Sequence, residues 1–191
     1  MRRLATAFAL LLAASSAFGA TYYIDYNAAN DSANGTSSAT PWKRAPGMVG
    51  FAGSYSHLAG DVFLFKGGST WGAAALPLTI GYSGTAGNVD TYRVATSGEW
   101  SGSTGYALFD GEGTDTNLLS AAGKSYIRVS GIDFYRNNTG SYKTVDISNG
   151  SNVELDHNHI RSETWIGFYL TYTASRSNIS IHHNDIESVA M

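Results

Sequence analysis

Three polar residues have the types and spacing needed to remove a proton from a carbon beside a carboxylate: Arg128, Asp156 and His182. The positions of Asp156 and His182 differ by 26, and those of Arg128 and Asp156 differ by 28. A histidine that is oriented by a carboxylate can act as a general base near neutral pH, and an arginine can neutralise the carboxylate of a substrate. The other interpretation is that all three are surface residues at the edge of the fold, satisfied by water and by each other.

The element that must position these residues is a phrase that occurs three times: YIRVSGIDF from Tyr126, NVELDHNHI from Asn152 and NISIHHNDI from Asn178. The interval between copies is constant, and a fixed period in this range is typical of stacked repeats. Read as a strand, each copy alternates apolar and polar residues, so every second side chain points to the same face. The repeat therefore predicts three stacked coils built from short strands.

Stacking sorts these side chains into columns along the coils. The inward positions are apolar in all three copies: Ile127, Val129, Val153, Leu155, Ile179 and Ile181. Two outward columns are expected side by side, one with Arg128, Glu154 and Ser180 and the other with Ser130, Asp156 and His182. Equivalent residues of neighbouring coils lie roughly 4.8 Å apart. We therefore expect Asp156 and His182 to be stacked one coil apart, close enough for a hydrogen bond.

Each copy contains a bend, because a further apolar position recurs at its end as Phe134, Ile160 and Ile186. Asn158 and Asn184 occupy equivalent positions at this bend, where an asparagine tolerates a left-handed backbone and can bond to the copy above. Residues 145–147 and 168–170 are expected to add a second strand to each coil, with loops of variable length between strands that stay in register. The one segment considered for a helix, 42–51, is limited to a turn or two by Gly47 and Gly50.

The N-terminus has the layout of a secretory signal peptide. Arg2 and Arg3 precede an apolar run over residues 4–14, and small residues follow, so cleavage is expected near Gly19 or Ala20 and the mature protein is expected to be secreted or periplasmic. The run is too short to span a bilayer, and no other stretch is long and apolar enough. Without the leader, ten basic residues stand against fifteen acidic ones, a net charge of about −5 that argues against nucleic acid as a partner. The chain has no cysteine, so no disulfide can stabilise it.

With the residues arranged in this way, the chain resembles the right-handed parallel β-helix proteins of the pectate-lyase-like superfamily. The resemblance extends to four earlier segments: TYYIDYNAANDSANGTSSATPWKRAPGM from Thr21, AGDVFLFKGGSTW from Ala59, YSGTAGNVDTY from Tyr82 and FDGEGT from Phe109. One departure is Val89, which follows Asn88 where proline is common in the family. The resemblance implies an all-β fold, a right-handed parallel β-helix that is a single-stranded solenoid with an N-terminal cap and the first coils.

The expected organisation is a signal peptide over residues 1–20 and one β-helix domain over 21–191. Within the domain, residues 21–115 would form the N-terminal cap and first irregular coils, and 116–191 the regular coils of 26-residue period. The last coil of a solenoid needs a polar cap, and none is visible before Met191, so the sequence is interpreted as a fragment that is incomplete at its C-terminus. We expect a monomer.

The resemblance also implies that an acidic polysaccharide lies along one outer sheet face. On this basis the protein is expected to be a secreted carbohydrate-active protein, a polysaccharide lyase acting by β-elimination, with Asp156, His182 and Arg128 as the catalytic candidates. A glycoside hydrolase is a second enzyme class that shares the scaffold. The alternative is a non-catalytic module, adhesin-like or glycan-binding, because the same scaffold motifs occur in proteins without activity.

Candidates for substrate binding are Glu154 and the aromatic residues in or beside the variable loops, since sugar rings stack on aromatic side chains. The aromatic candidates are Trp165, Tyr169 and Tyr172, with Tyr142 nearby; covering the core is their competing role.

For a metal, the resemblance points to Ca²⁺ held by Asp133 and Asp185, which form a column with His159 between them. His159 argues against a cage for a hard cation, and the pairs His157/His159 and His182/His183 lack the spacing and third ligand of a zinc site. No other cofactor is expected.

Overall fold

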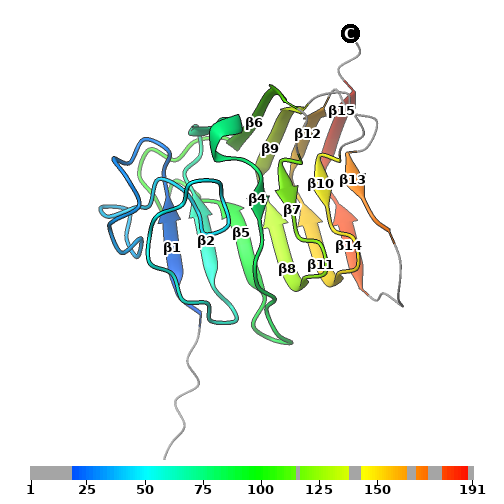
Figure 1. The fold of residues 1–191 in the computed structure, drawn as a ribbon, viewed down its shortest axis with the longest axis horizontal. Helices are drawn as coiled ribbons and strands as arrows, with labels where there is room; N and C mark the ends of the chain where they lie inside the picture. The colour runs from blue at the N-terminus through cyan, green and yellow to red at the C-terminus, as the bar shows by residue number, and fades with distance from the viewer. Residues whose placement is uncertain (1–18, 115–116, 138–142, 163–166, 172–177, 189–191) are drawn as a thin grey trace, which may run out of the picture.

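The chain forms a stack of coils in which successive strands go to three different parallel sheets (Figure 1). The computed structural model describes residues 19–114, 117–137, 143–162, 167–171 and 178–188. From β2 to β15 the strands enter sheet A, sheet B and sheet C in turn, and then return to sheet A in the next coil. All pairings between these strands are parallel within the described part of the chain. This is the all-β, right-handed parallel β-helix that the sequence predicts.

The three sheets follow the same path along the stack. Sheet A contains β1 (Thr21–Ile24), β2 (Val62–Phe65), β5 (Asp90–Val94), β8 (Ser125–Ser130), β11 (Ser151–Asp156) and β14 (Ile179–His182). Sheet B contains β3 (Thr70–Trp71), β6 (Ala107–Thr114), β9 (Ile132–Asn137), β12 (His159–Ser162) and β15 (Asp185–Ser188). Sheet C contains β4 (Leu78–Thr79), β7 (Leu119–Ser120), β10 (Val145–Asp146) and β13 (Phe168–Tyr169).

The repeated phrase stacks with the register that its period predicts. Val153 pairs with Ile127 on one side and with Ile179 on the other, and these three residues hold the same position in their copies of the phrase. The predicted second strand of each coil is also present, since β10 and β13 pair in parallel within residues 145–147 and 168–170. The division of the domain at residue 115 stays a prediction.

Aromatic side chains fill the interior of the first coils. The rings of Phe63 and Tyr92 stack with their centroids 4.6 Å apart, and Phe109 contacts Trp71 and Phe134 edge-to-face. In the later coils aliphatic side chains take the place of the aromatic ones, and Val153 and Leu155 are almost fully buried. This continuous core holds the strands of sheet A in a fixed register, so their outward side chains have fixed neighbours.

The bend between sheets A and B combines two devices. The first is a left-handed residue, at Gly131, His157 and His183 in successive coils, with φ of 71°, 53° and 53°. The second is the predicted asparagine ladder, in which the backbone N–H and the side-chain amide of Asn158 both donate to Oδ1 of Asn184, at 2.9 and 3.1 Å. The ladder is confirmed, but the left-handed position precedes the asparagine by one residue, so the predicted role of Asn158 in tolerating that backbone is wrong.

Residues 42–51 form turns and not the short helix considered from the sequence. Gly47 and Gly50 both have positive φ, 93° and 74°, which interrupts any helical path. Trp42 instead extends sheet A through a bridge to Ile24 and is fully buried. The short 3₁₀ helix of the described chain, η1, lies at Ala73–Ala75.

The predicted signal sequence falls almost entirely on residues 1–18, outside the described part of the chain. Across the residues that are described, no helix is both long enough and apolar enough to cross a bilayer.

Candidate active site

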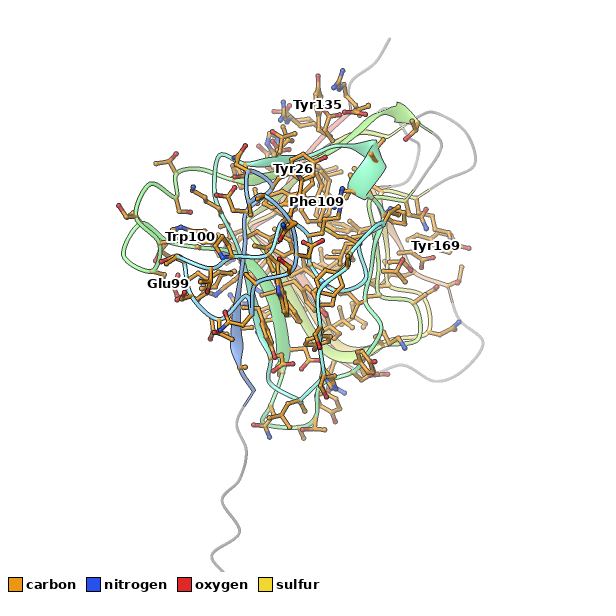
Figure 2. The ribbon with its side chains drawn as sticks, turned by 60° about the vertical axis from the view of Figure 1, so that its left-hand side comes forward. Tyr26, Glu99, Trp100, Phe109, Tyr135 and Tyr169 are labelled. Atoms are coloured by element: carbon orange, nitrogen blue, oxygen red, sulfur yellow. The ribbon has the colours of Figure 1, made fainter. Side chains whose placement is uncertain are left out.

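The outer face of sheet A is covered over its first coils and open over its last ones. The loop that follows β5 places Trp100 over Leu64, and both side chains are buried there. Figure 2 shows Trp100 and Glu99 on the side of the molecule away from Tyr169. Beyond this cover, the outward side chains of β8, β11 and β14 remain accessible, with Arg128, Glu154 and His182 each about 40% exposed. The open part of the face therefore carries the residues that the sequence selects for chemistry.

Arg128 and Asp156 form a bidentate ion pair across neighbouring coils. Nε of Arg128 donates to Oδ1 of Asp156 at 2.9 Å, and Nη2 donates to Oδ2 at 2.8 Å. The Ser130 hydroxyl and Nδ1 of His157 also lie within hydrogen-bonding distance of Oδ2, at 3.1 and 2.7 Å. The carboxylate is thus almost completely enclosed, with 1% of its side chain exposed.

This environment makes Asp156 a weak base. Burial alone would raise the pKa of its carboxyl, but hydrogen bonds from Arg128 and His157 outweigh burial and hold that pKa well below its usual range. The nearby carboxylate in turn raises the pKa of the Arg128 guanidinium. Asp156 therefore stays ionised and orients Arg128, while the exposed part of the guanidinium keeps donors for a second carboxylate.

His182 does not use the partner that the sequence predicts. It stands in register with Asp156, but within the described residues no hydrogen bond joins the two side chains. Instead, Nε2 of His182 lies 3.1 Å from Oε1 of Glu154. The expected pair of Asp156 and His182 is wrong because the carboxylate of Asp156 already accepts two hydrogen bonds from Arg128. In addition, Glu154 lies two positions along the neighbouring strand from Asp156, and its long side chain can reach His182.

Glu154, His182 and His183 form a linked series. A carboxylate can only accept, so Nε2 of His182 carries the hydrogen that it shares with Glu154. Nδ1 of His182 lies 2.7 Å from Nδ1 of His183, and in the neutral pair His183 must therefore donate. This leaves Nε2 of His183 with a free lone pair, and this atom makes no hydrogen bond within the described residues. His183 itself is exposed.

A third histidine completes the surface. The rings of His157 and His183 stack at 5.1 Å between centroids with an interplanar angle of 19°. Both residues occupy the left-handed position at the corner described above, so their side chains do not follow the alternation of inward and outward positions in the strand. From the sequence, these two histidines were considered only as members of the pairs His157/His159 and His182/His183, which lack the spacing of a zinc site, and they received no other role. The signal that could have identified them is Gly131, which marks the same position of the preceding coil as left-handed.

The predicted metal column lies on a different sheet. Asp133, His159 and Asp185 pair in register along β9, β12 and β15 of sheet B. Asp133 is bound by the guanidinium of Arg161, whose Nε donates to Oδ1 at 3.1 Å, so this carboxylate already has a cation. The assignment of Ca²⁺ to Asp133 and Asp185 stays a prediction.

The aromatic candidates do not join the open face of sheet A. Trp165, Tyr172 and Tyr142 lie outside the described residues. Tyr169 belongs to β13 in sheet C, where the ammonium of Lys143 sits 3.5 Å from its ring centroid. Of the predicted substrate-binding residues that the structure describes, Glu154 alone is placed beside Arg128 and His182, with Oε2 3.7 Å from Nε of Arg128.

The comparisons with known proteins bear on the fold. No family model matches the chain, and no curated protein does either. A solved structure described as a rhamnogalacturonan lyase is similar over 80% of this chain, with a TM-score of 0.58 and 18% sequence identity. The chain spans 38% of the length of that structure. At this identity the likeness supports the parallel β-helix and leaves the activity to be argued from the site.

Proposed function

We propose that the protein is a secreted or periplasmic polysaccharide lyase that cleaves an acidic polysaccharide by β-elimination on the open face of sheet A. The observation that carries this proposal is the series Glu154, His182 and His183, whose first residue lies beside Arg128. Glu154 connects the two parts, since its carboxylate lies 3.1 Å from His182 and 3.7 Å from Arg128. The solved structure with the similar fold is described as a rhamnogalacturonan lyase.

In this mechanism Arg128 binds the carboxylate of a uronate residue. Neutralising that carboxylate acidifies the adjacent C5–H bond and stabilises the negative charge that develops when the proton leaves. Asp156 keeps the guanidinium in place through its two hydrogen bonds. Arg128 thus acts on the substrate and Asp156 acts through Arg128 as a positioning residue.

Nε2 of His183 is the proposed base. It takes the C5 proton, the C5 electron pair forms a C4–C5 double bond, and the C4–O bond breaks with the glycosidic oxygen protonated by water. The positive charge on His183 is stabilised through His182 by the carboxylate of Glu154, because each hydrogen bond in the series points its donor toward that carboxylate. A base of this kind needs no metal at the reacting carbon.

The test is the formation of an unsaturated product that absorbs in the near ultraviolet. The purified protein is incubated with polygalacturonate, alginate and glycosaminoglycans, and the product is followed by absorbance and mass spectrometry. We expect turnover that is lost in His183→Ala and His182→Ala and retained in Ser180→Ala, a matched control from the outer face of β14. Retained turnover in both histidine variants would overturn the proposed base.

A non-catalytic glycan-binding module remains the alternative from another class. Glycan binding by the folded protein without unsaturated product from any substrate of the panel would contradict the lyase and favour that module.

A further inference from the structure

His159 presents a buried ring nitrogen to two carboxylates of the next coil. The distances from Nε2 are 3.8 Å to Oδ2 of Asp185 and 3.8 Å to Oε2 of Glu187. Both are too long for a hydrogen bond, and Nε2 has no hydrogen-bond partner among the described residues although it is shielded from solvent. A buried imidazole nitrogen without a partner is uncommon, since buried polar atoms are normally satisfied.

The spacing of the three atoms suits a bound ion. The ligand atoms of His159, Asp185 and Glu187 lie within 4.8 Å of one another. Zinc binds histidine nitrogen at about 2.0–2.1 Å and carboxylate oxygen at about 2.0–2.2 Å. The imidazole nitrogen and either carboxylate oxygen, at the separation given above, can therefore share one ion without a change in backbone position.

The other ring nitrogen of His159 also has a carboxylate as its neighbour. Nδ1 faces Oδ1 of Asp133 at 3.7 Å, a distance that is also longer than a hydrogen bond, on the opposite side of the ring from the two carboxylates of β15. A metal-bound histidine commonly directs its second nitrogen to a carboxylate, which fixes the ring orientation and the tautomer. Asp133 is itself held by Arg161, and the ring of Tyr106 packs against His159 with centroids 5.8 Å apart. The imidazole is therefore oriented from three sides.

We propose that His159, Asp185 and Glu187 bind a divalent transition-metal ion of the zinc class on the outer face of sheet B. One imidazole and two carboxylates favour zinc, cobalt or manganese over calcium, which prefers oxygen ligands alone. Two carboxylates also supply the charge that compensates a divalent ion. Arg161 is the nearby cation, in register with Glu187, and its bond to Asp133 leaves the carboxylate of Glu187 for the metal.

The expected consequence is a clamp between coils. β15 follows β12 in sheet B, and Asp185 and Glu187 are 68% and 57% exposed. An ion shared with His159 would tie these side chains to the preceding coil and leave coordination positions open to water. The proposal differs from the sequence-based assignment of Ca²⁺ in both the metal and the ligands, because His159 and Glu187 take the place of Asp133 beside Asp185.

Cobalt is the probe, because its visible absorption reports on coordination. Protein without a histidine tag is titrated with Co²⁺, and Zn²⁺ or Ca²⁺ is then added in competition. We expect one equivalent of saturable Co²⁺ binding, displaced by Zn²⁺ and not by equal Ca²⁺. His159→Gln and Glu187→Gln should each weaken binding by roughly tenfold or more, while a His182→Gln/His183→Gln double variant should bind as the unaltered protein does.

Glu187→Gln keeps the test decisive if His159→Gln fails to fold, because the Glu187 side chain is largely exposed. Circular dichroism and thermal unfolding of each variant establish that the fold is intact. No saturable binding to the folded protein, displacement by Ca²⁺, or unchanged binding in folded Glu187→Gln would each overturn the proposal.

Discussion

The side chain of Arg128 donates its hydrogen bonds to Asp156 and not to Glu154, although Glu154 is the residue with which Arg128 pairs in register. The same diagonal step joins His182 to Glu154 and Arg161 to Asp133. Backbone register thus follows the period of the repeat, whereas these charged side chains bond to the residue two positions along the neighbouring strand. The outer faces of the sheets are therefore joined by diagonal contacts that a comparison of equivalent positions does not identify.

Removal of the Asp156 carboxylate should be costly. Asp156→Ala removes both acceptors of Arg128 and those of Ser130 and His157 in a buried position. We expect the free energy of unfolding to fall by about 2–3 kcal/mol, as for loss of hydrogen bonds to a charged group. Urea denaturation measures this change. Glu154→Ala, at the neighbouring half-exposed position, should cost less than about 1 kcal/mol, and an equal loss in both variants would refute the structural role of the pair.

The Arg128–Asp156 pair should also make the free energy of unfolding depend on pH in the acidic range. The pKa of Asp156 is lower in the folded protein than its ordinary value, so its stabilisation is complete above the unfolded pKa of about 4 and is lost as pH falls below it. The difference in unfolding free energy between the unaltered protein and Asp156→Asn should stay constant from about pH 7 to pH 5 and shrink below about pH 4. A series of urea titrations across this range measures it, and a difference that persists undiminished to pH 3 would contradict the assignment.

The fold was predictable from the sequence because it depends on the 26-residue period of the repeat and on the apolar residues at its inward positions. Val153 occurs at a fixed distance from Ile127 and Ile179, and the register follows directly. The contacts of the candidate site depend instead on side-chain length and on competition for one acceptor. The carboxylate of Asp156 has one arginine, one hydroxyl and one imidazole within hydrogen-bonding distance. The sequence does not show which of these donors, or His182, will bind it.

The corner of each coil was likewise predictable from the sequence only in part. Asn158 and Asn184 were predictable as a ladder, because both lie at the bend with the same spacing. The left-handed backbone at His157 and His183 was not predicted, because the asparagine beside each of them also tolerates that conformation and was taken to be the left-handed residue.

Asn158 should be one of the most sensitive positions in the stack. Its Oδ1 accepts from the backbone N–H of Ile132 at 3.1 Å, and its Nδ2 donates to the carbonyl of Val129 at 3.0 Å. Asn158→Ala leaves these buried groups without partners, so we expect a loss of about 2–3 kcal/mol in unfolding free energy. Ser180→Ala, on the exposed face of β14, should change it by less than about 0.5 kcal/mol. Indistinguishable denaturation midpoints for the two variants would count against the ladder.

The left-handed corner predicts a reversal of the usual preference for alanine over glycine. His183 has φ of 53°, a conformation that glycine adopts freely and that costs alanine roughly 1–2 kcal/mol. His183→Gly and His183→Ala remove the same imidazole, so their difference isolates the backbone. We expect the glycine variant to have the higher melting temperature by calorimetry. A more stable alanine variant would show that the residue is not left-handed in solution.

The last prediction separates the role of Glu154 from that of the base. Glu154→Gln keeps the size of the side chain but removes the charge that stabilises protonated His183 through His182, and its exposed position predicts a small effect on stability. Under the proposed mechanism, kcat for the unsaturated product should fall by at least about tenfold. KM should change little, because Arg128 and not Glu154 binds the substrate carboxylate.

Steady-state kinetics on the substrate identified in the panel measures both constants. Glu154→Asp should recover part of the lost kcat because it restores the charge. A variant that raises KM and leaves kcat unchanged would instead place Glu154 in substrate binding, and the series from Glu154 to His183 would then have no part in proton removal.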